Sequence, residues 1–468
     1  MRRESALPLA LFRILFGACL ALDVGGLIRY APWWFDDVPF VAPTAVPVVP
    51  LLAVWLAAAV GLTLGLFTRA CAVVSYLACV GFLGFAAMPL AYEYHLDNLY
   101  ILASFALIFL PVERRLSIDA LRKPPATRTV GRGPGVFLAL LVASIYFDSA
   151  VWKLSSRMWM EGLGYWVPAC QPWDVLLSLP WTIENEWVAR GLGYVTLVYE
   201  LLFVVLVWFR RIRIPLLLVG FGLHVGIGTV IPLPLFGMLM IAFLVGLIPL
   251  RAPREGGGGA APGERPGRGP VAVFYAGWAF AFLLGFLEPV GALARYGVGG
   301  ATGAMPRPWH VTSDGALARA YSRTMTWSYR LFGFRSHPIF LDSQFVDYTV
   351  ETRLRYQAPG ETGEGRRFYG PIRNRMWLAW NYRMVWPLLP RQRVEDWLVR
   401  FVTFHAVRDG LDLERGQVVI EQRPIELPVT EWRPGQRERN VGSDWTRVGR
   451  ITGEPGSVVV LWQEPFWS

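Results

Sequence analysis

The sequence predicts an α-helical polytopic membrane protein with about nine transmembrane helices, followed by a C-terminal α+β domain on the non-cytoplasmic side. The chain of 468 residues is 54% hydrophobic and only 17% charged, whereas soluble chains carry roughly 25% charged residues. Apolar runs of about 20 residues, the length that crosses a bilayer, recur through most of the chain and then stop. The composition is that of a membrane protein with a polar portion appended.

Nine apolar runs are candidate spanning helices. They lie near residues 7–28, 46–67, 71–90, 95–112, 135–154, 190–209, 212–231, 233–250 and 271–296. The first run carries Arg13 and lacks a small-residue cleavage site, so we expect it to be kept rather than removed as a signal peptide. The transmembrane domain is therefore expected over 1–298, with a flexible Gly-, Pro- and Arg-rich linker at 251–270.

Basic residues give these helices an orientation. The segments MRRES, ERRLSIDALRKPPATRTVGR, RRIR and the linker fall on one side under the nine-helix count, together with Arg69. Cytoplasmic loops are rich in Lys and Arg, so this side and the N-terminus are predicted to be cytoplasmic. The Trp-rich loop 155–190 and everything after about Arg295 then lie outside. Topology explains part of the net charge of +10, and nucleic acid is not an expected partner.

The composition changes after Gly300 to that of a small folded domain. QFVDYTVETRLRY alternates like a strand, GQVVIEQRPIELP and SVVVLWQEPFW have strand composition, and VEDWLVRFVTFHAVRDG has the pattern of an amphipathic helix. These elements predict the extracytoplasmic α+β domain over 299–468.

Metal and redox sites are not indicated. Three of the four cysteines lie inside apolar runs and none has CxxC spacing, so we expect them to have a structural role as packed side chains. Motifs of dinucleotide-binding, phosphate-binding, zinc-protease and serine-hydrolase sites are also missing from the sequence.

Several ionisable residues lie within or at the ends of the apolar runs. At membrane depth each costs at least about 2.5 kcal/mol and usually faces a cavity or a partner. They are Arg13, Asp23, Asp148, Lys153, Glu200, His224 and Glu288. Each also has a purely structural explanation. Asp23 and Glu288 fit an interface, and His224 fits a hydrogen-bonded core residue. Arg13 could reach the cytoplasmic interface or pair with an acid such as Glu200.

The segment YFDSAVWKLSSRMWMEG, residues 146–162, carries the most informative of these residues. Lys occurs only at positions 123 and 153, and every other basic residue is Arg. A helix-end anchor would be expected to be Arg as well, whereas a buried Lys can lose its proton and act as a base. Pairing with Asp148 is the structural alternative, although five residues is poor spacing on one helix face. We therefore expect a chemical role for Lys153, with Glu200 and His224 facing the same cavity.

The order of several motifs resembles a known membrane family. ALFRILFGACLALD, LGLFTRAC, LSIDALRK, YFDSAVWKLSSRMWMEG and a His224 helix followed by LFGMLMIAF together resemble the membrane domain of vitamin K-dependent gamma-carboxylases. Bacterial relatives form the horizontally transferred transmembrane (HTTM) family. The resemblance covers roughly residues 5 to 250, and the C-terminal domain matches in position alone.

The resemblance implies a chemistry. Lys153, followed by Trp159, Glu161 and Gly162, corresponds to the base that deprotonates reduced vitamin K. A carboxylase of the carbon–carbon lyase type, or a related enzyme using another menaquinol-type quinol, is therefore expected. Oxygen and carbon dioxide would be co-substrates, without a metal. The candidate quinone-pocket residues are His95, Asn98, Asp148, Trp152, Trp159, Glu200 and His224.

The sequence also departs from that family. The carboxylase has a second lysine just before the base, where this chain has Trp152, and its Asn-His start to helix four appears here as HLDN, so His95 or Asn98 would stand in. The expected setting is the bacterial inner membrane, with an outer-face substrate such as a glutamate of a secreted or periplasmic peptide. The alternative is a non-catalytic HTTM protein that serves as maturation or immunity partner of a secreted peptide.

Overall fold

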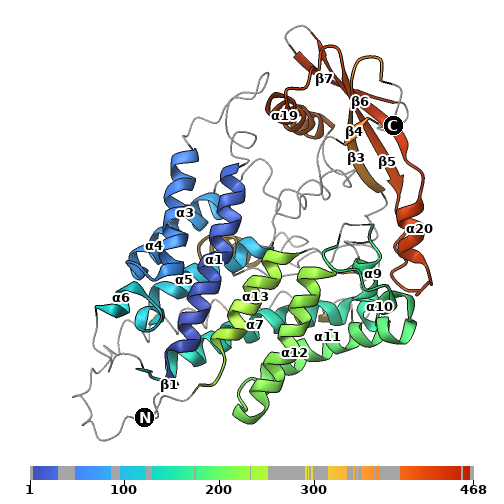
Figure 1. Cartoon of the computed structure of the whole chain (residues 1–468). Helices are drawn as coiled ribbons and strands as arrows, with labels where there is room; N and C mark the ends of the chain where they lie inside the picture. The colour runs from blue at the N-terminus through green and yellow to red at the C-terminus, as the bar shows by residue number, and fades with distance from the viewer. Residues whose placement is uncertain are drawn as a thin grey trace, which may run out of the picture.

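The computed structural model shows a helical bundle joined to a small sheet domain (Figure 1). The structure describes residues 4–29, 48–85, 95–122, 129–172, 175–231, 233–250, 290–291, 293–294, 297–298, 315–334, 341–342, 345, 350–361, 365–367, 391–454 and 457–463.

The bundle is built from eight main helices. These are α1 (Leu7–Arg29), α3 (Val48–Leu64), α4 (Thr68–Cys79) with its π-helical continuation η1 (Val80–Phe85), α5 (His95–Phe109), α7 (Gly133–Ser155), α11 (Glu186–Leu206), α12 (Arg210–Thr229) and α13 (Pro234–Gly246). Short elements connect them: β1 (Glu4–Ser5), η2 (Val112–Arg114), α6 (Ile118–Leu121), β2 (Thr129–Val130), α8 (Arg157–Met160), α9 (Trp166–Ala169) and α10 (Pro180–Glu184).

Eight of the nine predicted apolar runs are therefore helical. By length and composition, α1, α7, α11 and α12 can cross a membrane, and the other four are shorter apolar helices. The ninth run, 271–296, lies almost wholly outside the described residues, so the nine-helix count stays a prediction. Glu288 also lies outside them. Asp23 is buried rather than exposed at a helix end.

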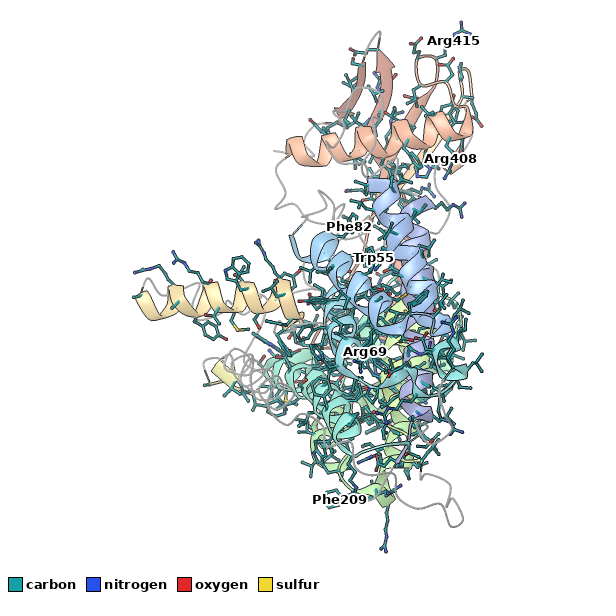
Figure 2. All side chains as sticks on the ribbon, turned by 90° about the vertical axis from the view of Figure 1, so that its left-hand side faces the viewer. Trp55, Arg69, Phe82, Phe209, Arg408 and Arg415 are labelled. Atoms are coloured by element: carbon teal, nitrogen blue, oxygen red, sulfur yellow. The ribbon has the colours of Figure 1, made fainter. Side chains whose placement is uncertain are left out.

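Helix α7 lies inside the bundle, while α11 and α12 lie on its outside. The most apolar stretch of α7 is 78% buried, against 33% for α11 and 28% for α12. Helix α1 packs between α3 and α13, and α7 packs against α11. Among the N-terminal helices, Trp55 of α3 stacks on Phe82 of η1 with ring centroids 5.5 Å apart (Figure 2). Side chains on α11 and α12 that face outward are mostly apolar, as expected for helices in contact with lipid.

Arg13 takes neither of its two expected roles. Its fully buried guanidinium donates to the carbonyls of Leu62, Thr63, Val112 and Leu116. These carbonyls lie at the end of α3 and around η2, where a helix end leaves acceptors without partners. Five N–H donors in a fixed fork suit this task. Arg13 therefore ties α1 to the ends of its neighbours, and Glu200 pairs elsewhere.

The C-terminal region forms an antiparallel sheet with strand order β4-β3-β5-β6-β7. Its strands are β3 (Val350–Gln357), β4 (Arg366–Arg367), β5 (Gln417–Pro424), β6 (Thr446–Glu454) and β7 (Ser457–Trp462), and its helices are α16 (Ala316–Phe332), α19 (Arg391–Asp409) and α20 (Gln436–Gly442). The three predicted strand segments and the predicted amphipathic helix are confirmed as β3, β5, β7 and α19. The patterns of β6, α16 and α20 were not recognised from the sequence.

The two faces of this sheet differ. Alternate residues of β3 are buried, whereas β5 is buried along most of its length, and Leu354 and Ile420 share one hydrophobic core with Leu398 and Phe401 of α19. The opposite face carries an ion-pair network in which Arg353 and Arg355 donate to Glu421. The sheet thus has an apolar face and a charged face, as expected for a small α+β domain.

The sheet domain docks on the loop that follows α7. Trp432 Nε1 donates to the Ile183 carbonyl (3.0 Å), the Gly435 amide to Glu184 (2.7 Å) and Asn440 Nδ2 to the Cys170 carbonyl (3.0 Å). Figure 1 shows α20 descending from the sheet beside α9 and α10. The C-terminal domain and the 155–190 loop therefore lie at the same end of the bundle.

Candidate functional site

A cavity of about 420 Å³ lies between α7, α11, α12 and α13, capped by the α8–α10 loop. This volume is in the range of small-molecule sites, roughly 300–1,000 Å³. Its walls are mainly Leu, Ile, Val, Met and aromatic side chains. The polar groups that line it are few, and they include Lys153, Glu200 and His224. Such a cavity favours a largely apolar ligand that makes a small number of hydrogen bonds.

Lys153 and Glu200 form the polar centre of the cavity. Lys153 lies in the last turn of α7 and is 3% exposed, and Glu200 lies on α11 and is 5% exposed. The ammonium group donates to Glu200 Oε1. A charge removed from water at this depth requires such a partner. Lys153 is thus a buried, paired amine and not an anchor in the interface.

Trp159 covers the amine. The Lys153 Nζ lies 4.5 Å from the Trp159 ring centroid, within cation–π distance. Ser156 caps the N-terminus of α8 by accepting from the Trp159 amide at 3.4 Å, which fixes the start of this turn. A Cβ at Gly164 would come within 2.2 Å of the Trp159 ring, and Gly162 has a φ of +75°. The glycines that follow Trp159 therefore let the chain turn tightly enough to place this ring over Lys153.

His224 occupies another wall of the cavity. Its Nε2 lies 2.7 Å from the Tyr146 hydroxyl, which joins α12 to α7. Tyr146 also packs against Phe203, with ring centroids 4.6 Å apart. The bond fixes the His224 ring, and the hydrogen-bonded core role remains consistent with this geometry. It also sets a polarisable pair beside the space that a ligand would fill.

Two buried polar atoms in this cavity have unused hydrogen-bonding capacity. Within the described residues, Glu200 Oε2 and His224 Nδ1 make no hydrogen bond of normal geometry, although the Ser149 hydroxyl interacts with the Glu200 carboxylate. A buried oxygen of a carboxylate without a partner is costly, and a hydroxyl donor would satisfy it. No group of three His, Cys, Asp or Glu side chains in the described ranges is arranged to hold a metal ion. The arrangement therefore fits an apolar molecule with a hydroxyl group, bound at an acid–amine pair.

The structure brings together only part of the sequence-predicted set. Lys153, Trp159, Glu200 and His224 line one cavity, as expected for a shared site, while their roles stay predictions. The other candidates lie elsewhere. Asn98, Asp148 and Trp152 are buried but do not line it. The side chain of His95 lies outside the described part of the chain. Lys153 pairs with Glu200 and not with Asp148.

The sequence interpretation missed several lining residues. Ser149 and Tyr146 line the cavity one and two turns before Lys153, respectively. Residues spaced by four and seven lie on one face of a helix, so this spacing was a usable signal. The same spacing places Asp148 and Trp152 on other faces. Phe236 and Met240 of α13 also line the cavity, and an apolar helix sequence gives no signal for which of its faces does so.

These features define an integral membrane protein with a buried lysine–glutamate pair in an apolar cavity. A model of the HTTM domain family matches residues 1–248, which is more than half of the chain and includes every helix of the bundle described above. The chain belongs to the HTTM domain family. No curated protein and no solved structure matches it significantly.

Proposed function

We propose that this protein is a quinol-dependent membrane enzyme of the vitamin K-dependent carboxylase type, with Lys153 as its base. The observation that most directly supports this proposal is the Lys153–Glu200 pair, which is buried beneath Trp159 in an apolar cavity. Glu200 Oε2 can still accept a hydrogen bond there. A quinol supplies an acidic hydroxyl on a flat apolar ring, and when bound it provides the reducing power for the reaction. The lining residues fit such a group, since they offer aromatic and aliphatic contacts and one hydroxyl acceptor.

The pair can hold and move the proton. Lys153 and Glu200 share one titratable proton, either as ammonium and carboxylate or as amine and carboxyl. In the second form Lys153 can accept a proton from a bound hydroxyl, and the resulting ammonium lies beside the developing negative charge. The site remains neutral throughout, which suits a buried cavity. Water exclusion by the apolar walls strengthens this interaction, and tight placement of the hydroxyl against the amine supplies the rest.

The proposed substrate side is the outer face of a bacterial inner membrane, where a secreted or periplasmic peptide glutamate would be carboxylated with oxygen and carbon dioxide. The α8–α10 loop caps the cavity, and the sheet domain docks on this loop. A peptide arriving at that end would meet both. This proximity supports an outer-face substrate.

Mass spectrometry of lipid-soluble molecules that copurify with the protein tests the ligand class. We expect a quinone near one equivalent for the wild type. The Ser149→Phe variant should lose it, because this residue lines the cavity beside Lys153 and a ring there would fill the space. The matched control is Ser144→Phe, in the same helix but outside the lining set. Absence of any quinone, with a small secreted peptide bound instead, would favour the non-catalytic alternative.

The proposed orientation places the N-terminus in the cytoplasm and the sheet domain outside. Its docking on the 155–190 loop puts both on one side, and the basic α11–α12 turn lies at the other end. Figure 2 shows Arg415 and Phe209 at opposite ends of the molecule. In intact spheroplasts, Arg415→Cys should react with an impermeant maleimide and Phe209→Cys should not. The reverse pattern would overturn the orientation.

A further inference from the structure

The cavity around Lys153 is open on one side, toward the outer surface of α11 and α12. Several residues that line it are also exposed on the outside of the bundle: Trp181 is 63% exposed, Val195 54% and Val219 47%. A closed core cavity would have no such members. The exposed members come from α10, α11 and α12, so the opening lies where these elements meet.

The arrangement of α11 and α12 accounts for this opening. They are antiparallel and joined by a short turn at 207–209. The cavity begins six residues before the end of α11, at Glu200, and nine residues into α12, at Val219. Tyr199 of α11 packs on Gly220 of α12, and beyond this contact the lining residues of the two helices border a gap that reaches the ion pair.

Two glycines form one edge of this gap. Gly222 and Gly226 lie one turn apart on α12 and line the cavity, and a Cβ on either would meet nothing within 4 Å. Other glycines of the same helix differ, since a Cβ at Gly220 would come within 2.0 Å of the Tyr199 hydroxyl. Gly220 is thus required by packing, whereas Gly222 and Gly226 keep a space free.

The surroundings of the gap match the bilayer and not water. Its rim is formed by Leu192, Val195 and Val219, all apolar and at least one third exposed. Trp181 of α10, which is 63% exposed, lies at the outer end of the gap, and Trp187, which is 86% exposed, lies just beyond it near the start of α11. Tryptophans at such positions mark the membrane–water interface. The gap therefore opens below the interface, into the hydrocarbon region.

We propose that this gap is a lateral portal through which the ligand enters from the bilayer, with its apolar tail left between α11 and α12. The ligand class is a membrane-dissolved amphiphile with a hydroxyl-bearing ring at Glu200 and Lys153 and a long hydrocarbon tail. This inference rests on the proposed function for the ring, while the route and the tail rest on the exposed rim and the two glycines. The portal predicts that the site binds a ligand with a long hydrocarbon tail more tightly than the same ring without a tail.

The test compares binding of menaquinol, which has a long isoprenoid tail, with binding of menadiol, which has the same ring and no tail, both kept reduced under anaerobic conditions. The full-length protein is studied in lipid nanodiscs. Gly222→Trp and Gly226→Trp should weaken menaquinol binding by at least about tenfold and affect menadiol binding little. Gly25→Trp is the matched control, because Gly25 also has open space around it and lies on α1 away from the cavity. A photoreactive group in the tail should crosslink to α11 or α12.

The outcomes separate the portal from the function. If neither quinol binds the wild type, the proposed quinol function fails and the portal fails with it. If both quinols bind, but equally well and without effect of either glycine substitution, the function stands and the portal is overturned. Crosslinks confined to α1 or α3 would also overturn the portal, since these helices do not line the cavity.

Discussion

Lys153→Arg is expected to lower quinol-dependent turnover by about 10²–10⁴-fold, the usual contribution of a general base. Arg keeps the positive charge beside Glu200 and fits the same ion pair, so the fold and the membrane insertion should persist. It cannot give up its proton under physiological conditions. The substitution therefore removes the base and leaves the pair. Turnover is measured as quinol oxidation coupled to carbon dioxide fixation in nanodiscs.

The chain offers a matched control for this substitution. Lys123 is its other lysine and lies in the basic segment before α7, so Lys123→Arg should leave turnover unchanged. Lys153→Ala should regain part of its activity with a small added amine, because the cavity of about 420 Å³ can admit one. Wild-type turnover in Lys153→Arg would return Lys153 to a purely structural role.

The sequence predicted the parts of this fold that depend on local composition. Eight helices follow from apolar runs, β3 and α19 follow from their periodicity, and β5 and β7 follow from their strand composition. The position of Lys153 in a cavity agrees with the sequence argument that a Lys, rather than an Arg, at this helix end favours a chemical role, and that role stays a prediction. Trp159 followed from its place beside that lysine.

The contacts between distant segments could not be predicted in the same way. Arg13 reaches carbonyls about 50 and 100 residues away, and nothing in its local sequence names helix ends as its partners. The pairing of Glu200 with Lys153 had Asp148 as a closer competitor in sequence. Helix direction settled it: Asp148 lies on another face of α7, whereas Glu200 comes from the helix packed beside it. A single sequence gives periodicity for each helix but not which helix its polar face meets.

The docking of the sheet domain could not be predicted from the sequence either. Trp432 and Asn440 bind backbone carbonyls of the loop, at Ile183 and Cys170. A carbonyl is present at every residue, so such contacts leave no mark on the loop sequence. The side-chain donors alone gave no sign that α20 meets the cap of the cavity.

Glu200→Leu is expected to destabilise the protein by about 3–5 kcal/mol, the cost of leaving a buried charge without its partner. Lys153→Met should cost a similar amount, since it leaves the Glu200 carboxyl among apolar side chains. The double variant should be near the wild type, because a buried ion pair replaced by apolar residues of similar volume is often neutral or stabilising. The free energy of unfolding, measured by denaturant titration in mixed micelles, gives the coupling energy of the pair.

The exposed pair of Arg190 and Glu161 is the control for this cycle. Its nitrogen and oxygen lie 3.9 Å apart and the Glu161 side chain is 43% exposed, so Glu161→Leu should change stability by less than about 1 kcal/mol. The double variant at 153 and 200 should be folded and inactive, which separates the two roles of the pair. If the losses of unfolding free energy from the two single substitutions were additive, Lys153 and Glu200 would not form an ion pair in the membrane. Turnover by the folded double variant would show that the proton leaves the ligand by another route.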